Sequence, residues 1–504
     1  MREAGVWSAY RAEDVRAGEA RVLPHVPDGL LMRKAAAGVA VACAEALRGR
    51  CGGVYGRRVV LLVGTGNNGG DALLAGALLR QRGARVDAVL VGDHAYQPGV
   101  EALRGAGGRL TDAGSADGLK SALAVLAKAD LVLDGLVGIS GSAGLRPPAD
   151  EVVGAISGAV LVVAVDLPSG VDPDTGETPG AHVRADVTVA CGALSPCLLV
   201  PPASYAVGRI VPVDVGVAGE MSRKPAVRRL GSAGVAARWP VPRRTDHKYT
   251  RGVLGVVAGS DTYPGAAVLA CAGAVRAGAG IVRYAGPQRV TEHVLAARPE
   301  VVPGLGRVRA WLLGSGVEDD ERQDAAIADA LTSGLPCVVD AGALDACVRR
   351  RAAGSRSAPA DDVLLTPHAG ELARMLQLLG YDVSREQVEA RPMHHAFWLA
   401  RKADATVLLK GHHTLIASPD GGLYSQADAP AWLATAGSGD VLAGIAGALM
   451  AAGVKAAEAG ALAASVHGRA ARRASEGGPL AASDIADATP ATVAELLRIH
   501  RRTP

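Results

Sequence analysis

Residues whose types and spacing could perform chemistry occur in short glycine-rich stretches in both halves of the sequence. The first half has "GTGNNGGDALL", "DGLVGISGSAG" and "VDLPSGVD", starting at positions 64, 134 and 165. Glycine loops of this kind bind phosphate through main-chain N–H groups, and Asn68, Asp134 and Ser169 supply oxygens that suit a hard cation. A carboxylate such as Asp166 could then move a proton.

The same stretches would also fit ordinary turns or a dinucleotide-binding loop. Asn, Asp, Ser and Gly are common turn residues, which would account for any one stretch taken alone. Gly64, Gly66 and Gly69 fit the G-x-G-x-x-G spacing of a dinucleotide-binding turn, with Asp87 available as the ribose-binding acid. No catalytic constellation of a dehydrogenase follows, and no Walker lysine follows the loop. The sequence therefore disfavours both a dehydrogenase and a P-loop NTPase.

The second half has "TPHAGE", "LKGHHT" and "AGSGDVLAG", starting at positions 366, 409 and 436. In the last of these, a glycine turn opens a helix with Asp440 at its entrance. Such a turn stabilises phosphate, and the carboxylate could accept a proton from a hydroxyl that is about to be phosphorylated. Lys410 and Thr414 could bind phosphates from another strand end. The alternative for Asp440 is a helix cap without chemistry.

Buried strands must position these residues. Runs such as "RRVVLLVG", "AVLVVAVDLPSG" and "DDVLLTPHAGE" lack polar alternation and are separated by Ala-rich helical segments. This pattern is typical of parallel strands that are buried on both faces, so both halves are predicted to be α/β. Ligands bind beyond the carboxyl ends of such strands, where the polar stretches lie. The apolar run from Val441 is shorter than the roughly 20 residues that a bilayer requires and indicates a buried helix.

The chain has 504 residues, more than one core usually organises, and its alternation breaks down between Met221 and Lys248. That segment is rich in Pro and Arg, so we place the boundary there and expect domains at 1–225 and 226–504. An Ala-rich helix at 29–49 is apolar enough on one side to dock on the first sheet or on a second subunit. We expect a homo-oligomer.

Composition excludes several classes of function. Aromatic residues make up 3% of the chain and the net charge is +3, so neither stacking platforms nor a strong basic surface favours a nucleic-acid partner. The seven cysteines show no C-x-x-C and no zinc spacing, which indicates thiols in a reducing compartment. Both charge signs precede any apolar run at the amino terminus, the wrong order for a secretory signal. We expect a cytoplasmic protein without a membrane partner.

The order of the stretches in the first half resembles the amino-terminal domain of the bifunctional NAD(P)H-hydrate repair enzymes, over most of residues 1–225. The resemblance implies a Rossmann-like, three-layer domain with a parallel sheet that epimerises hydrated NAD(P)H. It implies K⁺ at Asn68, Asp134 and Ser169, and Asp166 is our catalytic proton shuttle. The implied contacts to the hydrate are Asn67, Asn68, Gly69, Gly70, Asp71, Gly138, Ile139, Ser140, Gly141, Ser142, Ala143, Gly144 and Asp166.

The second half resembles the partner domain of the same family, an ADP- or ATP-dependent (6S)-NAD(P)H-hydrate dehydratase with a ribokinase-like fold. The resemblance rests on "GVLGVVAGSDTYPGAAVLACAGAVRAGAGIVR", "LLGSG" and the three stretches above, and it covers nearly all of residues 240–480. It implies that Ala266, Gly316, His368 and Asp440 contact the hydrate. The nucleotide is assigned to Lys410, Gly411, His412, His413, Thr414 and Gly439.

The resemblance implies metabolite repair in two steps. The first domain would interconvert the R and S hydrates of NADH and NADPH. The second would phosphorylate the S form from ADP or ATP, with Mg²⁺, at a hydroxyl activated by Asp440, and loss of phosphate would restore the double bond.

Two alternatives stay open. A ribokinase-like small-molecule kinase with a regulatory N-terminal domain would use the same glycine turn and aspartate. A non-catalytic NAD(P)-related binding scaffold would keep the fold but would not need buried acids such as Asp134 and Asp166.

Overall fold

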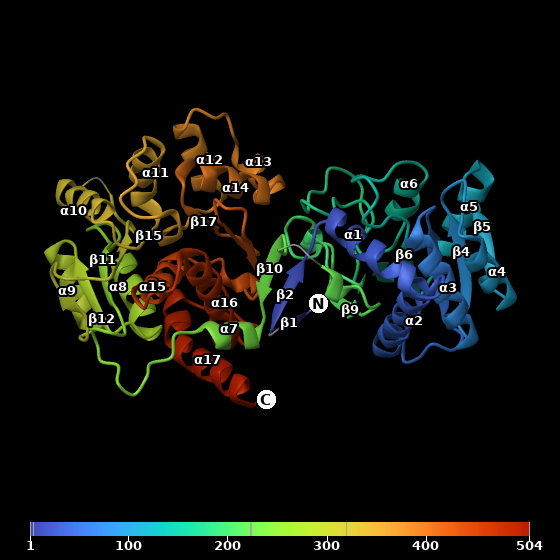
Figure 1. Ribbon diagram of the computed structural model, residues 1–504, viewed down its shortest axis with the longest axis horizontal. Coiled ribbons are helices and arrows are strands. Elements are labelled where there is room, and N and C mark those ends of the chain that lie inside the picture. The colour runs from blue at the N-terminus through green and yellow to red at the C-terminus, as the bar shows by residue number, and fades with distance from the viewer. Residues whose placement is uncertain (1, 4, 222–223, 319, 503–504) are drawn as a thin grey trace. The chain divides into compact units, whose positions relative to one another are not determined.

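The protein is described by a computed structural model of residues 2–3, 5–221, 224–318 and 320–502. Its contacts divide the chain into two compact units. Unit 1 is Ser8–Val227, and unit 2 is Arg228–Pro504 together with Arg2–Trp7. Nothing in the sequence pattern indicated that the first residues belong with unit 2. Each unit is α/β, which confirms the predicted fold class (Figure 1).

Unit 1 contains a seven-stranded sheet in which all neighbouring strands are parallel, in the order β5-β4-β3-β6-β7-β8-β9. The strands are β3 (Arg58–Val63), β4 (Arg85–Leu90), β5 (Arg109–Asp112), β6 (Leu131–Gly135), β7 (Leu161–Val165), β8 (Val187–Cys191) and β9 (Arg209–Val213). The strand order reverses between β3 and β6. At such a switch point the loops leave in opposite directions and open a crevice beyond the carboxyl ends of the strands.

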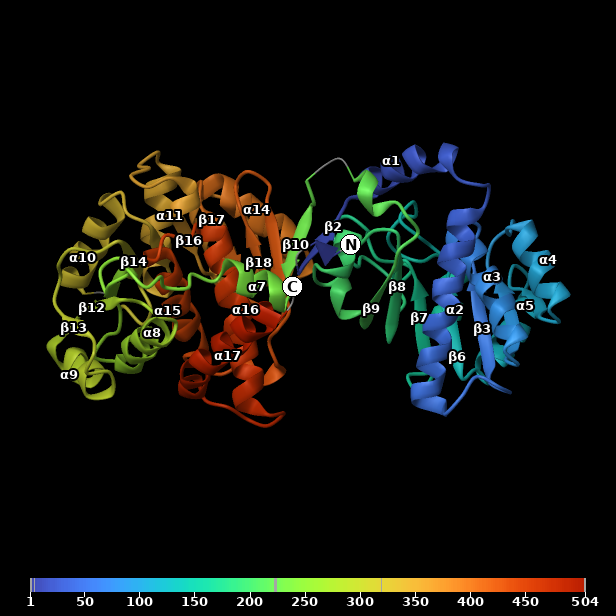
Figure 2. The ribbon, with the colours of Figure 1, turned by 60° about the horizontal axis from the view of Figure 1, so that its bottom comes forward.

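Helices cover both faces of this sheet because successive strand residues point to opposite sides. Leu61 packs with α2, α3 and α4, whereas its neighbour Leu62 packs with α5 and α6. Figure 2 shows α2 running across one face of the sheet. The helices of unit 1 are α1 (Ala12–Val22), α2 (Leu30–Cys51), α3 (Asn67–Gln81), α4 (Gln97–Gly105), α5 (Ala116–Leu126) and α6 (Ala149–Gly154).

Unit 2 contains a twelve-stranded sheet in the order β1-β2-β10-β19-β18-β17-β16-β15-β14-β11-β12-β13. Strands β11 to β17 pair in parallel, and the hairpins β17-β18 and β18-β19 are antiparallel. The strands are β1 (Arg2–Glu3), β2 (Val6–Ala9), β10 (Val227–Leu230), β11 (Val253–Val257), β12 (Ile281–Ala285), β13 (Val302–Pro303), β14 (Ala310–Leu313), β15 (Cys337–Val339), β16 (Val363–Leu365), β17 (Thr406–Leu409), β18 (Thr414–Ala417) and β19 (Leu423–Gln426).

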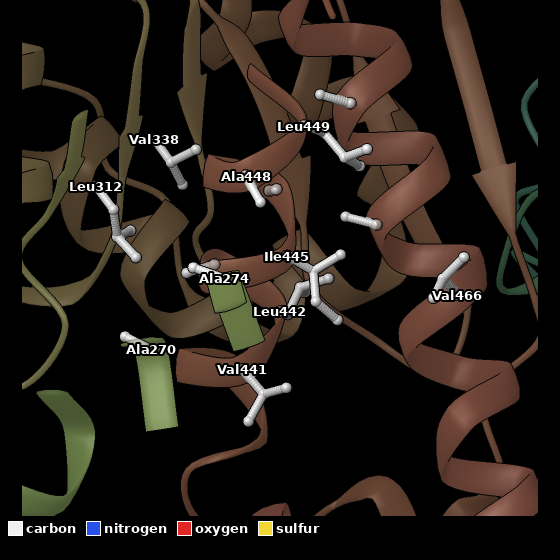
Figure 3. Close-up of a cluster of buried hydrophobic side chains, with 14 of the residues drawn as sticks. Ala270, Ala274, Leu312, Val338, Val441, Leu442, Ile445, Ala448, Leu449 and Val466 are labelled. Atoms are coloured by element: carbon white, nitrogen blue, oxygen red, sulfur yellow. The ribbon is translucent and has the colours of Figure 1, made fainter. Parts of the chain in front are cut away.

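The core of unit 2 is built around α15. The helices of this unit are α7 (Ser232–Arg238), α8 (Pro264–Arg276), α9 (Gln288–Ala297), α10 (Glu321–Thr332), α11 (Leu344–Ala352), α12 (Ala369–Leu378), α13 (Arg385–Ala390), α14 (Pro392–Ala403), α15 (Ser438–Ala451), α16 (Ala456–Ser475) and α17 (Ala482–Arg502). Every residue of α15 from Val441 onward is buried, which confirms the predicted buried helix. Figure 3 shows side chains of α15 between Ala270 of α8, Val466 of α16 and Leu312 of the sheet.

Small residues let α8 and α15 touch along their backbones. A Cβ added at Gly444 would lie 2.2 Å from the carbonyl oxygen of Ala270, and one at Gly273 would lie 2.5 Å from that of Val441. Only glycine permits this approach at either position. The contact holds the axis of α15 fixed, and full burial of side chains such as Ile445 contributes about 1.5–3 kcal/mol each.

The sequence shows no periodicity between Met221 and Lys248, but the structure has β10 and α7 within this segment. β10 has four residues and α7 has seven, too few for either period to stand out in the sequence. No helix within the described residues is both long enough and apolar enough to cross a membrane.

Candidate active sites

The carboxyl ends of β3, β6 and β7 bring the three polar stretches of unit 1 together. Residues 67–71 form the first turn of α3 directly after β3, residues 138–144 form the loop after β6, and Asp166 follows β7. Asp134 lies inside β6 rather than beyond its end. Because β3 and β7 both flank β6, these stretches converge on one crevice.

Glycines allow the loops to touch one another directly. A Cβ added at Gly64 would lie 1.9 Å from the carbonyl oxygen of Leu136, and one at Gly138 would lie 2.6 Å from Oδ1 of Asn68. A side chain at either position would push the loops apart. The glycines therefore set how closely the first turn of α3 approaches the loop after β6.

Buried oxygens form a compact cluster beneath this contact. Asn68 donates from Nδ2 to the carbonyl oxygens of Val165 at 2.8 Å and Val137 at 3.3 Å. Asp134 accepts from Ser169, through Oγ at 2.6 Å and through the main-chain N–H at 2.8 Å. Burial raises the pKa of Asp134 to about 6, although the hydrogen bonds from Ser169 lower it.

The chemistry of this cluster fits a hard cation. Asp134 is completely buried and forms no ion pair with any residue in the described ranges. A buried carboxylate, a hydroxyl, an amide oxygen and main-chain carbonyls are the donor types that bind such ions. The structure thus brings Asn68, Asp134 and Ser169 to one place, where a monovalent cation would neutralise the carboxylate.

Three acids lie together beside the oxygen cluster. Asp166 has a left-handed backbone with φ 67°, which is costly for a residue with a side chain. Burial raises its pKa to about 7, and the nearby Glu19 adds to the shift. Burial, Asp166 and Glu19 raise the pKa of Asp71 to about 8, and its Oδ1 has no hydrogen-bond partner in the described structure.

Glu19 was missed by the sequence analysis. It lies on α1, and burial raises its own pKa as well. No glycine or strand end accompanies it in the sequence, so only its position near Asp71 and Asp166 marks it as part of the site.

Unit 2 gathers its polar residues around Asp340, which follows β15. Asp340 is 3% exposed and accepts hydrogen bonds from Ser315 Oγ at 2.9 Å, Thr366 Oγ1 at 2.8 Å and Lys410 Nζ at 2.9 Å. The Lys410 ammonium also lies 3.7 Å from Glu371. Burial lowers the pKa of Lys410, but the carboxylates of Asp340 and Glu371 outweigh it, so the pKa is raised.

Asp440 lies in the first turn of α15, above this network. Burial raises its pKa to about 7, Asp340 adds to the shift, and both Lys410 and a hydrogen bond with Ser315 oppose it. The N-cap residue of α15 is Gly437, which has a left-handed conformation. The alternative prediction that Asp440 caps this helix is therefore wrong. A Cβ added at Gly439 would lie 3.6 Å from Lys410 Nζ, which places the ammonium over the glycine turn.

The predicted hydrate contacts lie around the same strand ends. Ala266 is in the first turn of α8, and Gly316 follows β14. The two residues lie close together, because a Cβ added at Gly316 would be 2.5 Å from the Cβ of Ala266. His368 caps α12 by accepting from the N–H of Glu371 at 3.1 Å. The N–H of Lys410 donates to the carbonyl oxygen of Pro367 at 2.8 Å, so the ends of β16 and β17 adjoin.

The remaining predicted nucleotide residues line the hairpin after β17. Gly411, His412 and His413 form the turn, and Thr414 begins β18. The carboxyl end of β17 therefore leads into an antiparallel hairpin with β18 and not into a crossover helix.

Asp340 was also missed by the sequence analysis, although its signal was present. "PCVVDAG" ends a buried strand with an acid, the same pattern that pointed to Asp166. Ser315 had a similar signal in "LLGSG". Asp340 accepts a hydrogen bond from the predicted residue Lys410, and Ser315, which donates to Asp340, lowers the pKa of Asp440.

A pocket of about 440 Å³ lies elsewhere in unit 2. It is lined by the segment after α7 and by the carboxyl ends of α8 and α15, with Trp239, Arg276 and Leu449 among its residues. Asp440 lies at the opposite end of α15, so this pocket contains none of the predicted site residues. No group of three or more His, Cys, Asp or Glu side chains in the described ranges is arranged to hold a metal ion.

These features define a two-unit α/β enzyme, with a buried acid cluster at a switch point in unit 1 and a lysine–aspartate site at a glycine-lined helix entrance in unit 2. Residues 29–197 match the model of the YjeF-related protein N-terminus, and residues 254–490 match that of NAD(P)H-hydrate dehydratase. The chain belongs to the family of bifunctional NAD(P)H-hydrate repair enzymes.

Curated relatives extend over nearly the whole chain. The bifunctional NAD(P)H-hydrate repair enzyme Nnr of Mycobacterium tuberculosis H37Rv is 45% identical over 460 residues, covering 90% of this chain and 91% of that one. The enzyme of the same name from Mycobacterium leprae is 44% identical over 502 residues, covering 98% of each chain. The crystal structure of the Bacillus subtilis ADP/ATP-dependent NAD(P)H-hydrate dehydratase is 28% identical, covers 53% of this chain and 97% of its own, and has a TM-score of 0.48.

Proposed function

We propose that the chain repairs hydrated NADH and NADPH, with epimerisation in unit 1 and ADP- or ATP-dependent dehydration of the S form in unit 2. Membership of the family and a match to both of its domain models support this function. The structural observation that carries it is Asp440, a carboxylate with a pKa of about 7 at a helix entrance over which Lys410 stands.

In unit 1, Asp166 moves the proton during epimerisation. A group with a pKa of about 7 can both accept and donate a proton near neutral pH, which reversible chemistry requires. Residues 67–71 and 138–144 hold the hydrate through main-chain N–H groups at the amino end of α3 and in the facing loop. Asp71 lies beside Asp166, and its buried, unpartnered Oδ1 is available to a ligand.

A potassium ion at Asn68, Asp134 and Ser169 fits the oxygen cluster of unit 1. When bound, it supplies positive charge where the hydrate's phosphates enter. The chain's own part is to keep these oxygens in place, through the bonds of Asn68 to Val165 and of Ser169 to Asp134.

In unit 2, Asp440 accepts the proton of the hydrate hydroxyl while a phosphoryl group passes to that oxygen. Phosphate then leaves with the carbon–oxygen bonding pair, and loss of a proton from the neighbouring carbon restores the double bond. Phosphorylation is needed because hydroxide is a poor leaving group. Ala266, Gly316 and His368 line the hydrate side of the site.

The nucleotide lies along Lys410–Thr414 and Gly439. Lys410 is anchored by Asp340, so its charge is fixed where phosphates meet the helix entrance. Mg²⁺ requires only one or two protein carboxylates when nucleotide phosphates supply its other ligands, and Glu371 lies within reach of the same ammonium. We further propose that the protein is cytoplasmic and forms a homo-oligomer.

One assay tests the proposal against a small-molecule kinase. Purified protein is incubated with mixed R and S hydrates, with and without ADP or ATP, and reduced-cofactor absorbance is followed. We expect complete recovery only with the nucleotide and Mg²⁺, and release of phosphate in equal amount. Accumulation of a phosphorylated product without recovery of absorbance would favour the kinase.

A further inference from the structure

The pocket between α17 and the carboxyl ends of α8 and α15 takes no part in the sites described above. Its volume of about 440 Å³ lies within the roughly 300–1,000 Å³ of pockets that enclose small ligands. Ala448 and Leu449 of α15 and Val493 and Leu497 of α17 line it with apolar side chains. The pocket therefore has the size and the apolar lining of a ligand site.

One wall of the pocket is the segment 239–252, which connects α7 to β11 without a helix or strand (Figure 1). A connection of this length without regular structure is uncommon in a compact domain and is usually functional. Pro240 and Pro242 line the pocket and fix φ along this part of the segment. Farther along, the N–H of Arg243 donates to Oδ2 of Asp246 at 2.7 Å and closes a turn. The segment itself holds the wall in place, as in a preformed pocket.

Two arginines bring positive charge to the pocket. Arg276 is the last residue of α8, Arg251 lies two residues before β11, and both line the pocket. Arg251 donates from Nη2 to the carbonyl oxygen of Gly278 at 3.0 Å, which leaves most of its five N–H donors unused within the described residues. Among the described residues that line the pocket, Asp246 is the only acid.

Arg276 is paired but not neutralised. Its Nη2 donates to Oδ1 of Asp487 at 2.7 Å, and Arg298 donates to the same oxygen at 3.2 Å, so one carboxylate serves two guanidinium groups. The Nε of Arg276 is buried and has no hydrogen-bond partner in the described structure. When Asp246 is set against Arg251, and Asp487 against the other two arginines, one positive charge stays uncompensated.

Charge and lining together select the ligand. An apolar pocket with one uncompensated positive charge complements a molecule that carries one negative charge on an apolar chain. A planar guanidinium binds a carboxylate through two parallel N–H···O bonds, so a carboxylate is the head group that fits these arginines. A neutral or cationic amphiphile would leave the positive charge uncompensated.

We propose that this pocket binds a small organic monocarboxylate with an apolar chain, at a site separate from the dehydration site of unit 2. The carboxylate pairs with Arg276 and Arg251, and the chain packs on Trp239, Leu449 and Val493. The inference is independent of the proposed repair function, because none of the residues assigned to that function lines the pocket.

Decanoate serves as the probe, and isothermal titration calorimetry of the full chain with saturating ADP and Mg²⁺ measures its binding. We expect one site per chain with a Kd on the order of 100 μM. Decan-1-ol and decyltrimethylammonium should bind at least about tenfold more weakly, since neither pairs with a guanidinium. Absence of decanoate binding, its displacement by ADP, or equal affinity for the alcohol would each overturn the inference.

Two variants locate the bound molecule. Arg276→Met should weaken decanoate binding by about tenfold or more, while Asp487 keeps its ion pair with Arg298. Ala494→Trp places a bulky side chain at an exposed position of α17 that lines the pocket, and should abolish binding. The matched control is Arg498→Met, which removes one arginine outside the pocket and should bind decanoate like the wild type. Wild-type affinity in either of the first two variants, at unchanged Tm, would refute the assignment.

A second copy of the chain is the competing occupant of this surface. If two chains covered the pocket, Ala494→Trp would lower the oligomeric mass in sedimentation velocity, and decanoate would compete with self-association. Either result would overturn the proposal. Unchanged mass in the wild type and all variants, with and without decanoate, is the result that we expect.

Discussion

Lys410 and Asp340 form an ion pair of 2.9 Å between the ends of β17 and β15, although 70 residues separate them in the sequence. The pair lies directly below the glycine turn of α15. Because Asp340 also accepts hydrogen bonds from Ser315 and Thr366, the ammonium is held in one position instead of sampling solvent. The electrostatics of the dehydration site are therefore organised around Asp340.

Substitution of Lys410 by Met should weaken both nucleotide binding and folding. It removes the cation from the phosphate site and leaves Asp340 buried without a countercharge. Breaking a fully buried pair costs about 3–5 kcal/mol, and we expect less here because the lysine side chain is 22% exposed. Isothermal titration with ADP and thermal unfolding measure the two effects. Wild-type ADP affinity in the variant would contradict the assignment.

Asp440→Asn should abolish ADP-dependent repair and leave epimerisation intact. The amide cannot accept the hydroxyl proton, so we expect a loss of at least about 10²-fold in kcat. Recovery of reduced-cofactor absorbance reports dehydration, and chromatographic separation of R and S hydrates reports epimerisation. Comparable loss of both activities would refute the division of labour between the units.

The dehydration rate should rise with pH through about 7, because only the ionised Asp440 can accept a proton. In Asp340→Asn the midpoint should move to lower pH, since a neighbouring negative charge that raises the pKa of Asp440 has been removed. Profiles of kcat between pH 5 and 9 measure the shift. A midpoint that moves to higher pH would be incompatible with this network.

Asp166→Asn should confine repair to the S hydrate. Without the Asp166 carboxyl to move the proton, unit 1 cannot convert the R form, so recovery from a mixed pool should stop when the S form is consumed. Asp440 is untouched, and repair of pure S hydrate serves as the control. Full recovery from the mixed pool at the wild-type rate would exclude Asp166 as the proton shuttle.

Asp71→Asn should stabilise unit 1 increasingly as pH rises. The folded pKa of Asp71, about 8, lies above its value in the unfolded chain, so its contribution to stability is greatest at low pH and falls until the folded group ionises. The gain in Tm of the variant should therefore be larger at pH 8 than at pH 5, at roughly 2–4 °C for each kcal/mol. Scanning calorimetry at both pH values checks this sign.

The sequence by itself determined the two α/β halves, the buried helix α15 and the family. Apolar runs without alternation mark strands buried on both faces, and glycine-rich stretches mark strand ends, because both depend on residues that are close in sequence. The resemblance added functional roles to residues within those stretches. None of these inferences required knowledge of which strands are neighbours.

The tertiary structure alone decided which residues meet. It placed Asp340 between Lys410 and Ser315, brought Glu19 beside Asp166 and added β2 to the sheet of unit 2. Strand order and helix packing are set by burial summed over the whole core. A short run of sequence records that a residue will be buried, but the partner beside which it is buried depends on segments tens or hundreds of residues away.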